Sequence, residues 1–158
     1  TRRHGPTAFA LTRQKVPSIR RDPGFDPGDV LRGAYVAQEA AGGRPDCVLV
    51  ATGSELHLAV GAKAKLEASG RRVRVVSAPC LEAFAEQPAE YRARVLPPGS
   101  RRASIEAGRT SPWRAIVGDD GLTIGIDRFG ASAPYQTIAE KLGLTVDAVT
   151  ERVSAWLG

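Results

Sequence analysis

One apolar run, followed at once by a glycine turn and an amphipathic stretch, constrains the fold of this chain more than any other feature. The run Cys47–Ala51 is rich in β-branched residues and contains no polar residue, which is typical of a parallel strand buried on both faces. After Thr52-Gly53-Ser54 the apolar residues return at helical spacing. This apolar stripe is formed by Leu58, Ala59, Ala62 and Leu66. A second β-branched run, Val73–Ser77, completes a strand–helix–strand unit, so the sequence predicts an α/β fold.

The ends of the predicted helix carry ordinary signals for starting and stopping. Ser54 is a good N-cap, Glu55 places a carboxylate in the first turn, and Gly70 stands where helices commonly end. Leu56 and Val60 lie off the main apolar stripe. We therefore expect a second partner, such as another domain, to cover this helix.

The turn itself has two interpretations. Free backbone N–H groups at a helix N-terminus can bind an anion, so Thr52, Gly53 and Ser54 form a candidate anion site. Alternatively, this turn only needs a flexible residue and a cap, as any strand-to-helix turn in such a sheet does. The sequence has neither a G-x-G-x-x-G nor a G-x-x-x-x-G-K-[ST] motif, which weakens the case for nucleotide binding.

The rest of the chain continues the alternation of strands and helices. Further strands are expected at residues 7–14, 33–38, 102–106 and 122–126, and helices at 81–84, 88–95, 113–117, after Ser132 and Pro134, and after Thr145. This alternation predicts a mostly parallel sheet of about five strands covered by helices. Residues 15–29 are rich in Pro and Gly among charges, which indicates a stiff linker and a domain boundary near residue 30.

Composition excludes several classes of function. Hydrophobic content of 42% and charged content of 25% are those of a globular protein, and no apolar run approaches the length of a membrane span. The net charge is +5, but the paired arginines are not interleaved with aromatic residues, which favours a solvated basic surface over nucleic-acid binding. Cys47 and Cys80 lack metal-ligand spacing and indicate packed, reduced thiols in a cytoplasmic protein. Because the chain has no Met and begins at Thr1, we expect it to be a piece of a longer protein.

Several motifs, taken in order, resemble the C-terminal part of transketolase over essentially the whole chain. They are Leu11-Thr12-Arg13-Gln14, Ala51-Thr52-Gly53-Ser54-Glu55, Arg74-Val75-Val76-Ser77-Ala78-Pro79, Phe84, Glu106-Ala107-Gly108, Trp113, and Asp127-Arg128-Phe129-Gly130-Ala131-Ser132-Ala133-Pro134. The resemblance implies a Rossmann-like three-layer sandwich with a mixed sheet. It also implies that residues 1–14 are the tail of a pyrimidine-binding domain, 15–29 an interdomain linker, and 30–158 the C-terminal domain.

The function implied by this resemblance belongs to a larger enzyme. Transketolases transfer a two-carbon ketol unit between sugar phosphates in the pentose phosphate pathway, using thiamine diphosphate and a divalent metal, Mg or Ca. The resemblance implies a cytoplasmic homodimer in which this segment supports assembly alongside the other domains, holds neither cofactor nor metal, and has no catalytic residue or activity of its own. No membrane or nucleic-acid partner is implied.

Two short stretches bear on individual sites. Arg13 stands where the family's Leu-Ser-Arg-Gln motif binds the phosphate of the sugar substrate, a role suited to the bidentate guanidinium. Gly118-Asp119-Asp120-Gly121 has a superficial likeness to the family's diphosphate-and-metal motif, but the chain contains no Asn, so we predict a β-turn.

Two other functions stay open at this stage. The chain can be a free-standing regulatory module that binds an anion at Thr52–Ser54. It can also be the C-terminal domain of another thiamine-diphosphate enzyme, such as a dehydrogenase β-subunit or a deoxyxylulose-phosphate synthase. The Leu-Thr-Arg-Gln and Phe-Gly-x-Ser-Ala-Pro stretches favour transketolase over these relatives.

Overall fold

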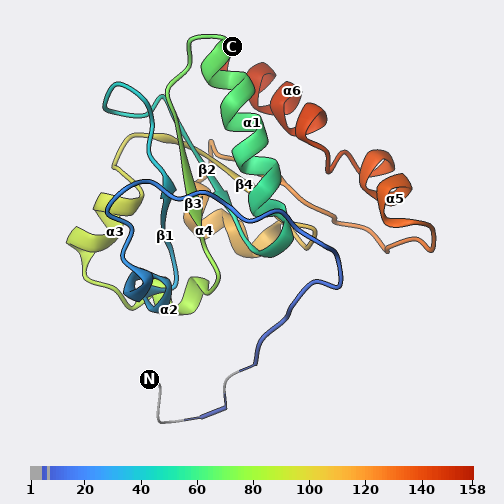
Figure 1. Ribbon diagram of the computed structural model, residues 1–158, viewed down its shortest axis with the longest axis horizontal. Helices are drawn as coiled ribbons and strands as arrows, with labels where there is room; N and C mark the ends of the chain where they lie inside the picture. The colour runs from blue at the N-terminus through green and yellow to red at the C-terminus, as the bar shows by residue number, and fades with distance from the viewer. Residues whose placement is uncertain (1–4, 7) are drawn as a thin grey trace.

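A five-stranded mixed sheet forms the centre of the molecule (Figure 1). The computed structural model describes residues 5–6 and 8–158. The sheet has the strand order β1-β3-β2-β4-β5. The strands are β1 Tyr35–Gln38, β2 Cys47–Ala51, β3 Val73–Ser77, β4 Arg101–Ile105 and β5 Leu122–Ile124. All neighbouring pairs are parallel except β1 with β3, so the predicted fold class, α/β with a mostly parallel sheet of about five strands, is confirmed.

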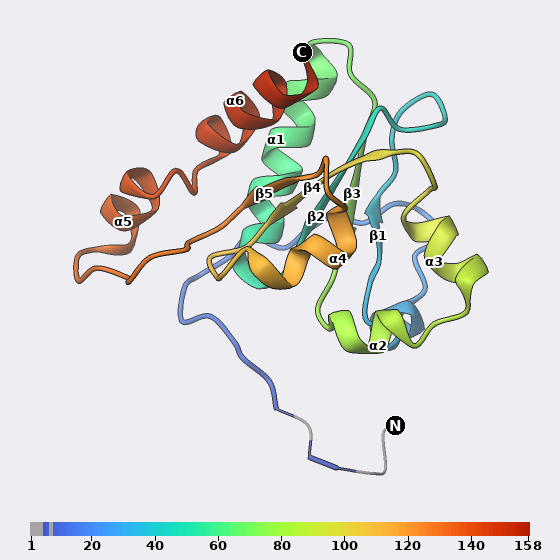
Figure 2. The same ribbon diagram turned by 180° about the vertical axis from the view of Figure 1, so that it is seen from behind.

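Helices cover both faces of the sheet and give three layers (Figures 1 and 2). The α-helices are α1 Leu56–Ala68, α2 Leu81–Ala85, α3 Ala89–Val95, α4 Arg114–Val117, α5 Tyr135–Lys141 and α6 Val146–Leu157. Three 3₁₀ helices, η1 Pro27–Arg32, η2 Gly53–Glu55 and η3 Ser111–Trp113, precede β1, α1 and α4. The long helices α1 and α6 lie on one face, and the short helices α2, α3 and α4 lie on the other.

Successive side chains of β2 point to opposite faces of the sheet, so this one strand contributes to two hydrophobic cores. Cys47, Leu49 and Ala51 pack in the core under α1 and α6, whereas Val48 and Val50 pack in the core under α2–α4. All five residues of the strand are at most 1% exposed. An uninterrupted apolar run is therefore the sequence that this central position requires.

Helix α6 packs along α1 on the side that carries Gly61 and Lys65. Leu56 and Val60 lie on another side of α1, so the expectation that another domain covers them stays a prediction. Thr145 caps α6, its hydroxyl oxygen accepting from the backbone N–H of Ala148 at 3.2 Å, as its position predicted. Val149 and Val153 from α6 are fully buried in the shared core.

The segment before η1 is irregular and largely exposed. The strand expected at residues 7–14 is absent from residues 8–14, and Thr7 lies outside the described residues. Phe9 and Leu11 are more than four-fifths exposed, so this segment has no neighbouring strand with which to pair. Farther on, Phe25 packs on Tyr35, with 5.1 Å between ring centroids, and Arg21 donates to the Tyr35 hydroxyl.

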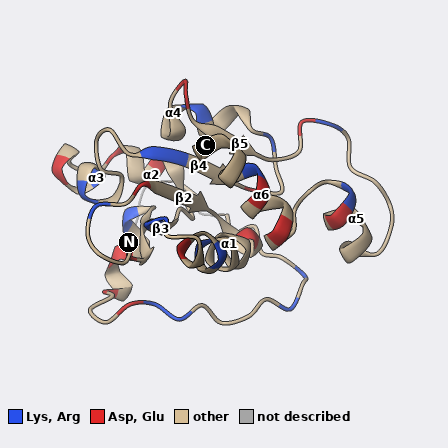
Figure 3. Cartoon of the chain, turned by 90° about the horizontal axis from the view of Figure 1, so that it is seen from above, with Lys and Arg blue, Asp and Glu red and all other residues tan. Residues whose placement is uncertain are grey.

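The basic residues do not gather into one surface. Figure 3 shows Lys and Arg spread over many elements and interspersed with Asp and Glu. Several paired arginines hold the fold together rather than only facing solvent. Arg72 bonds Asp46 at 2.6 Å, and Arg101 lies over the Trp156 ring.

Candidate functional site

The carboxyl ends of the four parallel strands meet at one edge of the sheet, which is where open α/β sheets place functional groups. Thr52 follows β2, Glu106 follows β4 and Gly125 follows β5 at this edge. The antiparallel strand β1 begins at the same edge, since Tyr35 pairs with Ser77 at the end of β3. The chain segment that carries Arg13 lies near this edge, since its neighbour Gln14 hydrogen-bonds Tyr135, which is also close to Glu55 after β2.

The turn after β2 has a different capping arrangement from the predicted one. Thr52 is extended, Gly53 adopts a left-handed φ of 55°, and η2 leads directly into α1. The prediction that Ser54 is the N-cap was wrong, because its hydroxyl donates to Glu55 Oε1 at 2.8 Å instead of accepting from a backbone N–H. The single 3₁₀ turn puts Ser54 inside the helical segment rather than before it.

Glu55 occupies the end of α1 that the candidate anion would use. Its side chain is only 5% exposed, and its carboxylate adds negative charge at the positive end of the helix dipole. An external anion at Thr52, Gly53 and Ser54 would meet this carboxylate. The anion site at the turn stays a prediction, and the buried Glu55 weighs against it.

The Leu-Thr-Arg-Gln stretch lies near this helix end. Burial raises the pKa of Tyr135 at the start of α5, and the charge of Glu55 raises it further, whereas a hydrogen bond with Gln14 lowers it. Gln14, Glu55 and Tyr135 therefore meet at the carboxyl edge although they are far apart in sequence. Arg13 is exposed, and its side chain makes no hydrogen bond or ion pair with any described residue.

The other half of the edge is held by two side-chain pairs that sequence reasoning missed. Glu106 Oε2 accepts from Trp113 Nε1 at 2.6 Å, and Asp127 accepts from both the hydroxyl and the backbone N–H of Thr110. The Thr110 hydroxyl, followed by its backbone N–H, lowers the pKa of Asp127. A buried tryptophan needs an acceptor for its N–H, so the sequence could have indicated that Trp113 pairs with a nearby acceptor.

The loop after β5 projects from the edge into solvent. Residues 127–137 are all exposed, and Phe129 is 96% exposed. Ser132 does not cap α5, whose N-cap is Pro134, and a Cβ at Gly130 would meet no atom within 4 Å. Ser132 and Gly130 therefore lie in the exposed loop, and α5 begins only after Pro134.

Within the described residues, nothing suits a divalent metal. Residues 5–6 and 8–158 contain no group of three His, Cys, Asp or Glu side chains that could hold an ion. Gly118–Gly121 forms the predicted turn, since the Gly121 N–H donates to the Gly118 carbonyl at 3.2 Å. The described helices are all too short or too polar to cross a lipid bilayer.

Comparison with known proteins gives a consistent result. Residues 33–145 match the family model described as the transketolase-like TK C-terminal domain. Transketolase from Aquifex aeolicus is 47% identical over 153 residues, which cover 96% of this chain and 22% of the relative. Transketolase from Geobacillus stearothermophilus is 46% identical over 97% of this chain and 23% of its own length. A solved transketolase from Leishmania mexicana superimposes with a TM-score of 0.76 and 37% identity, covering 85% of this chain and 19% of the solved chain. The chain thus spans about a fifth of the length of these relatives.

Proposed function

The chain belongs to the transketolase family through its C-terminal domain, and we propose that it is the C-terminal segment of an enzyme that transfers a two-carbon ketol unit between sugar phosphates. The observation that carries this proposal is the family match over residues 33–145 together with near-half identity to bacterial transketolases. In the proposed enzyme, thiamine diphosphate supplies the carbanion chemistry and a divalent metal holds its diphosphate.

The role proposed for the chain itself is assembly. Residues 1–14 would end the preceding pyrimidine-binding domain, 15–29 would join the domains, and 30–158 would form the C-terminal domain of a cytoplasmic homodimer. The exposed loop 127–137 at the carboxyl edge, and the exposed Phe9 and Leu11 in the chain before the domain, support this role because they leave apolar side chains uncovered.

The mass of the native protein tests the parentage. An immunoblot of source-cell extract against this segment should reveal a band several times heavier than 16.7 kDa. That band should co-purify with ketol transfer that depends on thiamine diphosphate. The isolated 158 residues should neither transfer ketol units nor bind the cofactor. A native band near 16.7 kDa would contradict the proposal.

Arg13 is the one residue proposed to touch substrate in the intact enzyme. It is exposed near the carboxyl edge, and its guanidinium makes no bond to any described residue. We expect Arg13→Gln in the full-length enzyme to raise KM for phosphorylated sugars by about tenfold or more, because a charge-assisted bond to phosphate is lost. Activity with an unphosphorylated ketose donor should stay near the wild-type value. Equal losses with both donors would argue against phosphate binding by Arg13.

A further inference from the structure

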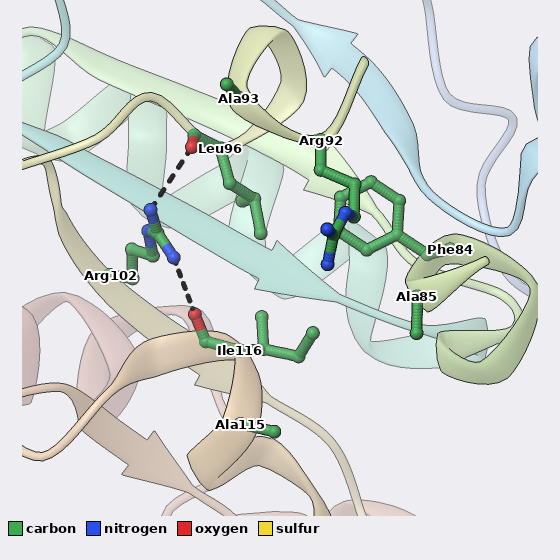
Figure 4. A pocket seen from close by; sticks show the side chains of 8 residues that line it. All are labelled: Phe84, Ala85, Arg92, Ala93, Leu96, Arg102, Ala115 and Ile116. Carbon is green, nitrogen blue, oxygen red and sulfur yellow. Dashed lines mark hydrogen bonds between the residues drawn. The ribbon is translucent and has the colours of Figure 1, made fainter. Parts of the chain in front are cut away.

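A pocket on the face opposite α1 and α6 is lined by two arginines and six apolar residues. It has a volume of about 300 Å³ and lies between α2, α3, α4 and the start of β4 (Figure 4). Its lining consists of Phe84, Ala85, Arg92, Ala93, Leu96, Arg102, Ala115 and Ile116. The only formal charges in this lining are therefore two positive ones.

Arg102 enters the pocket from β4 and is mostly buried. Its Nη1 donates to the Ile116 carbonyl at 3.0 Å, and its Nη2 donates to the carbonyls of Leu96 and Pro97 at 3.1 and 3.2 Å. These acceptors are neutral, so they orient the guanidinium without cancelling its charge. Its Nε is buried and has no acceptor among the described residues. Burial also lowers the pKa of Arg102.

Arg92 supplies the second positive charge from α3. Figure 4 shows its side chain reaching into the pocket from the side opposite Arg102. The Arg92 guanidinium makes no hydrogen bond or ion pair with any described residue. Two guanidinium groups facing one partly apolar hollow repel each other, and an anion between them would relieve this repulsion.

We propose that this pocket binds a small oxyanion, a phosphate or carboxylate group, between the guanidinium groups of Arg92 and Arg102. Arg92 presents paired N–H donors in a rigid fork that suits a planar or tetrahedral oxyanion. Arg102, whose Nη groups already donate to carbonyls, contributes its positive charge to the pocket. The carbonyls of Leu96, Pro97 and Ile116 fix Arg102, so its share of the site is already in place before the ligand arrives. The apolar walls suit a ligand that carries a short carbon skeleton behind its anionic group. This inference rests on the pocket alone and does not depend on the proposed function.

Titration of the ¹⁵N-labelled chain, followed through the Nε–H signals of its arginines, tests the site directly. Inorganic phosphate and sodium acetate are separate probes, each added at constant ionic strength maintained with sodium chloride. We expect at least one probe to shift the Arg92 and Arg102 signals saturably, with a dissociation constant of about 1 mM or below. Saturation with phosphate alone identifies a phosphate site, and saturation with acetate alone identifies a carboxylate site. Saturation with both identifies a general oxyanion site.

Two variants on α3 distinguish binding in the pocket from a general effect of positive surface charge. Arg92→Gln should weaken binding by about tenfold or more, because a charged donor is lost from an exposed position that should not disturb folding. Arg94→Gln is the matched control, since the Arg94 guanidinium lies over the Tyr91 ring, 4.9 Å from its centroid, and not in the pocket. Failure of both probes to saturate, shifts equal to those with sodium chloride alone, or equal effects of the two variants would overturn the proposal.

Discussion

At the scale of single residues, the bond from Trp113 to Glu106 joins η3 to the end of β4. We expect Trp113→Phe to lower the free energy of unfolding by about 1–3 kcal/mol, because it leaves the Glu106 carboxylate without its N–H donor at a buried indole site. Urea denaturation with an unchanged m-value measures this loss. Glu106→Gln keeps an acceptor oxygen and should cost less. Equal stability of Trp113→Phe and wild type would show that the bond contributes nothing.

The ion pair between Asp46 and Arg72 makes the stability of the fold depend on pH. The Arg72 side chain, followed by its backbone N–H, holds the pKa of Asp46 below its ordinary value of 3.8. A carboxyl whose pKa is lowered by folding stabilises the fold above its unfolded pKa, and this contribution is lost as pH falls through the folded pKa. We expect Asp46→Asn to be less stable than wild type near neutral pH, with the difference in urea midpoint shrinking as the pH falls below 3.8. Arg72→Gln should remove the same acid dependence. A difference that persists unchanged in acid would point to lost packing instead.

At the scale of elements, α1 and α6 approach each other closely at Gly61. A Cβ there would lie 2.7 and 2.9 Å from the two Cγ atoms of Val146. Alanine favours a helix over glycine by about 1 kcal/mol, but overpacking costs about 1–3 kcal/mol, so we expect Gly61→Ala to destabilise the chain. In the background of Val146→Ala the same substitution should become neutral or stabilising. A double-mutant cycle of unfolding free energies measures this coupling, and strict additivity would contradict it.

The strands and most helices could be predicted because their signals are local. Cys47–Ala51 must be buried on both faces, and Thr145 caps α6 with its own side chain. The errors concern positions that depend on distant partners. Residues 8–14, expected as a strand, have no strand beside them with which to pair. The Arg92–Arg102 pocket left no sequence signal, because two arginines ten positions apart meet only after β4 has paired with β2.

At the scale of the whole molecule, the exposed loop 127–137 predicts a contact with the rest of the proposed enzyme. Phe129 is too exposed to contribute to the stability of this chain, so its burial must come from elsewhere if it serves assembly. We expect backbone amides of residues 127–134 to exchange hydrogen rapidly in the isolated chain and to be protected in the full-length protein. Hydrogen exchange followed by mass spectrometry measures this, with the exposed turn Gly118–Gly121 as an internal comparison. Equal exchange of the loop in both proteins would contradict the assembly role.

The reversed direction of β1 also makes the two edges of the sheet unequal as places for engineering. Because β1 runs antiparallel to its one neighbour, β3, the loop from Glu39 to Asp46 turns back at the amino edge of the sheet, opposite the carboxyl edge. Gly42 and Gly43 at its tip are exposed, and a side-chain carbon at either would touch nothing within 4 Å. An epitope or fluorophore peptide inserted between these glycines would hang from the side remote from Arg13, the turn after β2 and Phe129. A label between Gly42 and Gly43 would therefore leave the carboxyl edge free for assembly with other domains.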